Sequence, residues 1–122
     1  MKIRIQGNTI RFRLTKQEVS DFASHGELRG KVEFGSSELV YQLIRYQQKD
    51  FSVSFVRGVI SVNIPESTVN AWANSEQVGF EGEVTYPNGQ NLSLLVEKDF
   101  QCLIPRKEDE SDFFDNPKAI NN

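Results

Sequence analysis

The feature that most constrains this chain is a pattern of apolar side chains that occurs twice. When residues 3–34 are compared with residues 53–84, a shift of 50 positions, apolar residues coincide at ten positions, where about five would coincide by chance. An internal repeat explains this agreement better than chance does. We therefore expect two similar halves, at about 3–46 and 53–96.

Within each half, the pattern predicts strand, strand, short helix, strand, strand. In the first half, apolar and polar residues alternate on both sides of positions 7–8, a Gly-Asn pair that favours a hairpin turn. A two-residue loop there sets Ile5 opposite Ile10, with the apolar residues on one face. The corresponding turn of the second half lies at positions 57–58, an Arg-Gly pair.

Each half also carries the signals of one short helix. Thr15 stands at an N-cap position with Glu18 three residues further on, which is the capping-box pattern. Apolar residues then follow at i, i+3 and i+4 in both halves. We therefore expect helices at 15–24 and 65–74.

Phe22 and Trp72 lie in the apolar stripes of these helices, and we expect them to have equivalent places in one core. Two ββαββ units with little else bury their faces economically as an intertwined or closed barrel. We therefore predict a mainly β, α+β fold: a pseudo-twofold barrel of about eight strands with two short helices capping its ends. At 122 residues and 13.9 kDa, the length fits a single domain over 1–104 followed by a flexible acidic C-terminal tail over 105–122.

The bulk composition favours a cytoplasmic protein. Its one cysteine, Cys102, excludes an intrachain disulfide and fits a reducing compartment. No apolar run approaches the ~20 residues that span a bilayer, so we expect no membrane association. The formal net charge of −3 falls in the C-terminal part, where residues 99–122 hold six acidic and three basic side chains. The rest of the chain is neutral overall, which argues against nucleic acid as the default partner.

Four cations gather on one small face of the first predicted hairpin. The register that pairs the apolar residues also sets Arg4 opposite Arg11 and Lys2 opposite Arg13. Like charges directly across a strand pair are destabilising, so this face either stays solvated or binds an anion. That anion would be an external ligand or the chain's own acidic segment, residues 108–112. The matching positions of the second half are uncharged: Ser52, Ser54, Ser61 and Asn63.

A second group of residues has the chemistry of weak metal ligands. Glu97 and Asp99 are two positions apart, so in an extended segment they point the same way, and Cys102 and His25 are further candidates. No paired Cys or His spacing accompanies them, and a cysteine among apolar neighbours is more often a small buried residue. We therefore expect no cofactor.

Two resemblances to known families rest on short segments. The opening MKIRIQGN (1–8), the segment VEKDFQCL (96–103) and the run EDESD (108–112) together resemble a family of small bacterial proteins known only as a domain of unknown function. This resemblance covers nearly the whole chain and implies a compact domain with no particular activity. In the second half, ISVNIPE (60–66), its helix and a Gly-containing hairpin resemble the swapped-hairpin units of AbrB-type and related cradle-loop barrels over about forty residues. In AbrB-type proteins two such units from two chains form one DNA-binding barrel, whereas here both would lie in one chain.

The function that these observations favour is a non-enzymatic binding or interaction module, with an anionic ligand or a protein partner at the cationic hairpin face. Two alternatives stay open: a small metal-dependent enzyme that uses Glu97, Asp99 and Cys102, and an AbrB-like DNA-binding regulator. We favour a non-catalytic role over an enzymatic one, because no motif in the chain indicates a named chemistry. The oligomeric state stays open between monomer and homodimer.

Overall fold

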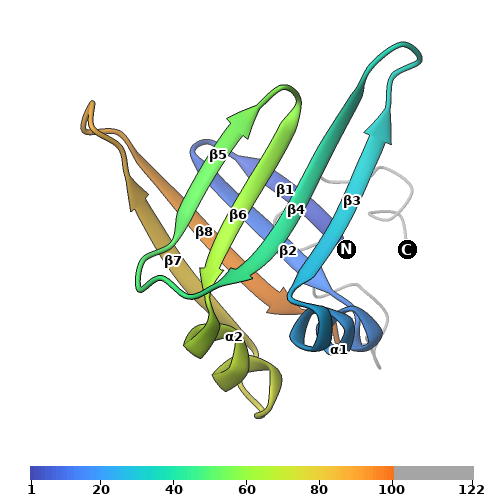
Figure 1. Ribbon diagram of the computed structural model, residues 1–122, viewed down its shortest axis with the longest axis vertical. Helices are drawn as coiled ribbons and strands as arrows, with labels where there is room; N and C mark the ends of the chain where they lie inside the picture. Colours follow the sequence, from blue (N-terminus) through green and yellow to red (C-terminus); the bar gives the residue numbers. More distant parts are fainter. Residues whose placement is uncertain (101–122) are drawn as a thin grey trace, which may run out of the picture.

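A computed structural model describes residues 1–100, which form eight strands and two helices (Figure 1). In chain order the elements are β1 (Lys2–Gln6), β2 (Thr9–Leu14), α1 (Lys16–His25), β3 (Glu27–Glu33), β4 (Glu38–Tyr46), β5 (Ser52–Val56), β6 (Val59–Pro65), α2 (Glu66–Ala73), β7 (Gly79–Thr85) and β8 (Asn91–Lys98). Each half therefore has the predicted order of strand, strand, helix, strand, strand. The fold is α+β and mainly β, with two similar halves.

The two halves exchange hairpins. One four-stranded sheet, sheet A, has the order β1-β2-β8-β7, and the other, sheet B, has the order β3-β4-β6-β5. Each sheet thus joins a hairpin of the first half to a hairpin of the second half, through the parallel pairs β2·β8 and β4·β6. The pairs within each hairpin are antiparallel. Interchanging the two halves therefore turns the strand order of sheet A into that of sheet B.

Of the intertwined or closed barrel that the sequence predicts, the closed form is wrong, because the eight strands form two separate sheets. A barrel needs an unbroken ring of strand pairs, and among residues 1–100 no strand pair links sheet A to sheet B. Strands β1, β7, β3 and β5 are therefore sheet edges. The apolar faces of the sheets and the two helices bury one common core instead, so closing the edges is not needed to remove apolar surface from water.

The predicted hairpin register is confirmed, and the uniform 50-residue shift fails beyond the helices. Ile5 lies opposite Ile10 in the β1·β2 pair. The connection from α2 to β7 is longer than that from α1 to β3, so β7 begins 52 positions after β3 (79 − 27). The 50-residue shift aligns Leu28 with the exposed Val78. With the 52-residue shift, Leu28 corresponds instead to the buried Phe80, the second residue of β7.

Both helices lie side by side at the same end of the molecule, so the prediction that they cap its two ends is wrong (Figure 1). The capping box of α1 is confirmed: the Thr15 hydroxyl accepts a hydrogen bond from the backbone N–H of Glu18, whose carboxylate accepts one from the backbone N–H of Thr15. Phe22 of α1 and Trp72 of α2 are fully buried in one core, as predicted. Within residues 1–100, no helix is long and apolar enough to cross a membrane.

Candidate functional site

The four cations of the predicted site lie on the outer face of sheet A. Lys2 and Arg4 belong to β1 and stand directly opposite Arg13 and Arg11 of β2, as the sequence predicts. Side chains alternate along β2, and Phe12 is fully buried, so the two arginines point away from the core. We call Lys2, Arg4, Arg11 and Arg13 the cationic patch.

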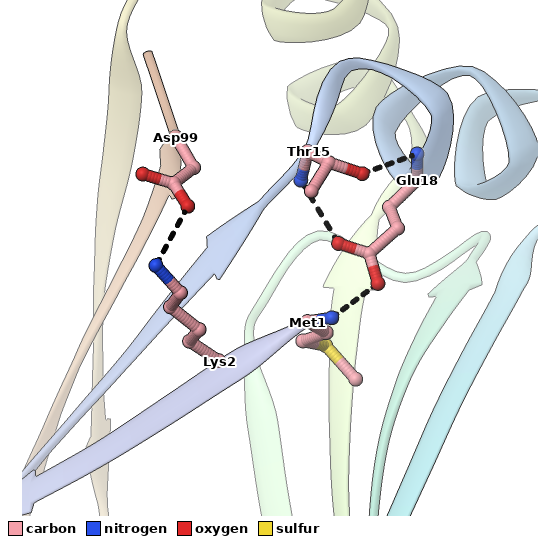
Figure 2. A network of polar contacts seen from close by, with 5 residues as sticks. All are labelled: Met1, Lys2, Thr15, Glu18 and Asp99. Atoms are coloured by element: carbon pink, nitrogen blue, oxygen red, sulfur yellow. Dashed lines mark hydrogen bonds and ion pairs between the residues drawn. The ribbon is translucent and has the colours of Figure 1, made fainter. Parts of the chain in front are cut away.

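The parallel neighbour β8 brings carboxylates to the cationic patch. Glu97 stands level with Arg13, and its Oε1 atom lies 3.5 Å from Nε of Arg13 and 3.6 Å from Nε of Arg11. Just beyond β8, Oδ2 of Asp99 lies 3.1 Å from Nζ of Lys2 (Figure 2). Two residues that the sequence suggests as metal ligands are therefore counter-ions of the cationic patch.

These ion pairs leave the cationic patch with an excess of positive charge. The Oε1 atom of Glu97 is buried but makes no hydrogen bond within residues 1–100, since both arginine nitrogens are too distant for good hydrogen-bond geometry. Among the ion pairs of the same residues, none involves Arg4. The side chain of Lys2 is 70% exposed, so its pair with Asp99 is screened by water. Four cations thus share two carboxylates.

The other half of the same outer face is acidic. Strand β7, at the far edge of sheet A, places Glu81 level with Leu95 and Glu83 level with Ser93 of β8. Because Arg11 is also level with Leu95, one row across the sheet runs from the cations of β1 and β2 to a carboxylate on β7. The outer face of sheet A is therefore dipolar. Sequence reasoning missed this feature, because only the parallel β2·β8 pair brings the two hairpins side by side.

The other suggested metal ligands take up different places. His25 is the last residue of α1, and its Nδ1 atom lies 3.1 Å from the backbone oxygen of Asp21. Cys102 lies outside the described residues. Within residues 1–100, no group of three His, Cys, Asp or Glu side chains is placed to hold a metal ion. Glu97 and Asp99 have cationic neighbours instead.

A cavity of ≈ 720 Å³ lies next to the cationic patch, between the two helices and the end of β8. Its lining combines apolar side chains of α1, such as Val19 and Ala23, with the charged Lys16 and Asp99. Asp99 borders both features, because its carboxylate also pairs with Lys2. Asp99 therefore links the cationic patch to the lining of this cavity.

A second ionic network ties the start of β1 to α1 (Figure 2). The amine of Met1 pairs with Oε2 of Glu18, and Oε1 of the same carboxylate accepts the backbone N–H of Thr15 at 2.9 Å. Burial raises the pKa of Glu18, but the hydrogen bonds from the amine and from Thr15, with the attraction of the amine, outweigh it and leave the pKa below its ordinary value. The sequence predicts the capping box but not the amine contact, which depends on where the fold places β1.

Compared with known protein families, residues 1–118 match the one described as "Family of unknown function (DUF7009)". The chain belongs to the DUF7009 family. The resemblance to an uncharacterised domain family, stated from the sequence, is thereby confirmed over nearly the whole chain. No curated protein and no solved structure matches the chain. In this member of the DUF7009 family, the cationic patch with its two carboxylates is the strongest candidate site.

Proposed function

We propose that the protein is a non-enzymatic binding or interaction module that holds an anionic ligand or an acidic protein partner on the cationic patch of sheet A. The observation that carries this proposal is the imbalance of the patch, in which four cations on two neighbouring strands share two carboxylates. The like-charge pairs Arg4–Arg11 and Lys2–Arg13 are unfavourable without a nearby anion. A bound anion relieves this repulsion, so binding should also stabilise the hairpin.

The geometry of Glu97 supports an exchangeable occupant. Its carboxylate is shared between Arg11 and Arg13 at 3.5–3.6 Å, longer than the about 2.7–2.9 Å of a charge-assisted hydrogen bond. Guanidinium groups held this loosely keep donors available for a phosphate or carboxylate ligand. Arg4, beside Arg11, adds a further cation to the same group.

The acidic half of the face narrows the class of partner. A long, uniformly negative polymer lying across sheet A would meet Glu81 and Glu83 on β7. A compact anion, or a protein partner with acidic and basic groups side by side, matches the dipolar face better. The formal net charge of −3 also favours such partners over duplex nucleic acid.

We also propose that the protein is cytoplasmic and that its two halves arose as an internal repeat. A single cysteine supports a cytoplasmic protein, and the equivalent strand orders of the two sheets support an internal repeat. The acidic tail at 105–122 lies outside the described residues and is proposed as a competing anion.

The second half supplies matched substitutions for a test. It carries Ser54 opposite Ser61, in the places where the first half carries Arg4 opposite Arg11. The double variant Arg4→Ser/Arg11→Ser therefore removes two charges with residues that the same hairpin geometry tolerates. Titration calorimetry with inorganic tripolyphosphate, a compact anion, and with a short acidic peptide should show an affinity at least about tenfold lower, with a weaker dependence on salt.

A control removes the same charge from sheet B. Arg29→Ser/Lys31→Ser on β3 should leave both affinities within about twofold of the wild type. Equal losses in the two double variants would indicate nonspecific attraction only. A wild-type chain that binds neither probe at low salt would contradict the proposed function.

A further inference from the structure

The four sheet edges differ in charge. Strands β1, β3 and β7 each carry two or more charged side chains, whereas β5, with the sequence SVSFV, carries none. Charged side chains on an edge strand are a common protection against edge-to-edge pairing. Strand β5 lacks this protection although it corresponds to β1 in the other half. Its Phe55 and Val56 are also 70% and 60% exposed.

The last three residues of β5 are exposed, whereas Val53 is buried. Among residues 1–100, β5 pairs with β6 alone. The hydroxyl of Tyr86 donates to the carbonyl of Val53 at 3.0 Å, which indicates that the backbone polar groups of Val53 point away from β6. Because this direction alternates along an antiparallel pair, those of Phe55 point the same way. A carbonyl has two lone pairs, so that of Val53 can accept a second hydrogen bond.

We propose that β5 pairs antiparallel with β5 of a second copy of this chain, around a twofold axis at Ser54. This register sets Val53 opposite Phe55 of the other copy and joins the outward-pointing backbone groups into one ladder. It also sets Ser52 opposite Val56, and Ser54 opposite its own copy. Every opposed pair is uncharged, and the exposed ring of Phe55 is covered at the contact.

A second copy is favoured as the partner because a twofold contact must be self-complementary. In the equivalent symmetric pairing, β3 would set Arg29 opposite Lys31, and β7 would set Glu81 opposite Glu83. Strand β1 would set Arg4 opposite its own copy. Like charges directly across a strand pair are destabilising. Of the four edges within residues 1–100, β5 alone meets the requirement.

The pairing would join sheet B of each copy into one continuous sheet of twice the width. Two five-residue strands alone bury less than the about 1,600 Å² of a standard stable interface. The dimer should therefore be weak and its population should rise with concentration. The cationic patch lies on sheet A, so a failure here leaves the proposed anion binding untouched.

Sedimentation velocity of the full chain over a range of concentrations tests the pairing. The wild type should shift from monomer to dimer, and Phe55→Lys, which adds a charge to the edge, should raise the dissociation constant at least about tenfold. Phe34→Lys is the matched control, because Phe34 is 64% exposed and lies just beyond β3. It should leave the dissociation constant unchanged. A wild type that stays monomeric at its solubility limit, or a dimer that responds equally to both variants, would overturn the proposal.

The register has its own test in a Cys102→Ser background. Opposed residues of a non-hydrogen-bonded antiparallel pair have Cα atoms about 4.5 Å apart, which lies within disulfide range. Mild oxidation should therefore link Ser54→Cys into a covalent dimer. Ser36→Cys, at an exposed serine in the β3–β4 connection, should stay monomeric. Equal cross-linking of both variants, or none of either, would overturn the pairing at Ser54.

Discussion

The rings of Trp72 and Phe80 meet edge to face, with centroids 5.2 Å apart and an angle of 80° between their planes. The indole N–H of Trp72 donates to the backbone oxygen of Val78 at 3.1 Å, so α2 is fastened to the start of β7. Because the side chain is fully buried, we expect Trp72→Ala to lower the free energy of unfolding by about 3–5 kcal/mol.

Chemical denaturation measures this loss. Trp72→Phe keeps one aromatic ring but removes the N–H donor and part of the buried volume, so it should be destabilising, though less than the alanine variant. Val78→Ala, at an exposed neighbouring position, should change stability by about 0.5 kcal/mol or less. A loss below about 1 kcal/mol for Trp72→Ala would contradict its place in the core.

The ring of Phe51 lies against the backbone of Gly82, where an added Cβ atom would be 2.7 Å from Cγ of Phe51. Phe51 also packs on Phe80, with ring centroids 6.0 Å apart, which limits its movement. Gly82→Ala should therefore cost about 1–3 kcal/mol through overpacking. In a double-mutant cycle measured by denaturation, adding Phe51→Leu should recover part of this cost. Strictly additive losses would show that the two residues do not clash.

The local features of the fold could be predicted because they depend on neighbours in the chain. The β1·β2 register follows from the alternation around Ile5 and Ile10, and the capping box follows from the spacing of Thr15 and Glu18. The way in which the hairpins combine could not be predicted locally. The parallel β2·β8 pair sets Phe12 beside Val96, 84 positions away (96 − 12). Apolar inner faces are buried by two stacked sheets as well as by a closed barrel, so the pattern alone does not decide between them.

In the candidate site, too, the local features could be predicted and the long-range ones could not. The cationic patch could be predicted, because the register of one hairpin assembles it. The role of Glu97 could not, because its place beside Arg13 depends on the long-range β2·β8 pair. Side-chain chemistry alone suggests Glu97 and Asp99 as metal ligands. The fold gives both of them cationic neighbours.

The single charge of Glu97 is shared by Arg11 and Arg13, so its loss should increase the repulsion within the cationic patch. Glu97→Gln should lower the free energy of unfolding by about 1 kcal/mol or less at low salt, and the effect should shrink as salt screens Arg11 and Arg13. Glu81→Gln removes the same charge from β7 of the same face and should cost less. Urea denaturation at low and high salt measures both variants. Equal behaviour would show that Glu97 is not the counter-ion of these arginines.

The acidic segment at 108–112 stays a prediction as an internal competitor for the cationic patch, and it lies outside the described residues. Asp99 contacts Lys2, and the nine steps from there to Glu108 span at most about 30 Å when extended, enough to cross sheet A at about 4.8 Å per strand. Deleting residues 106–122 should lower stability modestly at low salt and hardly at all at high salt. It should also strengthen tripolyphosphate binding. If both quantities match those of the full chain, the segment does not contact the patch.

Glu18 links the amine of Met1 to the capping box of α1, so the stability of this corner should depend on pH. Its pKa in the folded protein is lowered, because the hydrogen bonds and the charge of the amine outweigh the opposing effect of burial. A carboxyl with a lowered folded pKa stabilises the fold above its unfolded pKa, and this contribution is lost as the pH falls through the folded pKa. Stability should therefore decline as the pH falls below about 4.5.

Glu18→Gln separates this contribution from the titration of other acids. The variant should be less stable than the wild type at neutral pH, and the difference should narrow as the pH falls below about 4.5, since protonation removes the same charge from the wild type. Glu66→Gln is the matched control, because Glu66 is the first-turn acid of α2, whose N-cap makes no side-chain hydrogen bond. Urea denaturation at several pH values gives the three curves. If the difference between wild type and Glu18→Gln does not change with pH, or equals that for Glu66→Gln, the carboxylate of Glu18 does not join β1 to α1 through its charge.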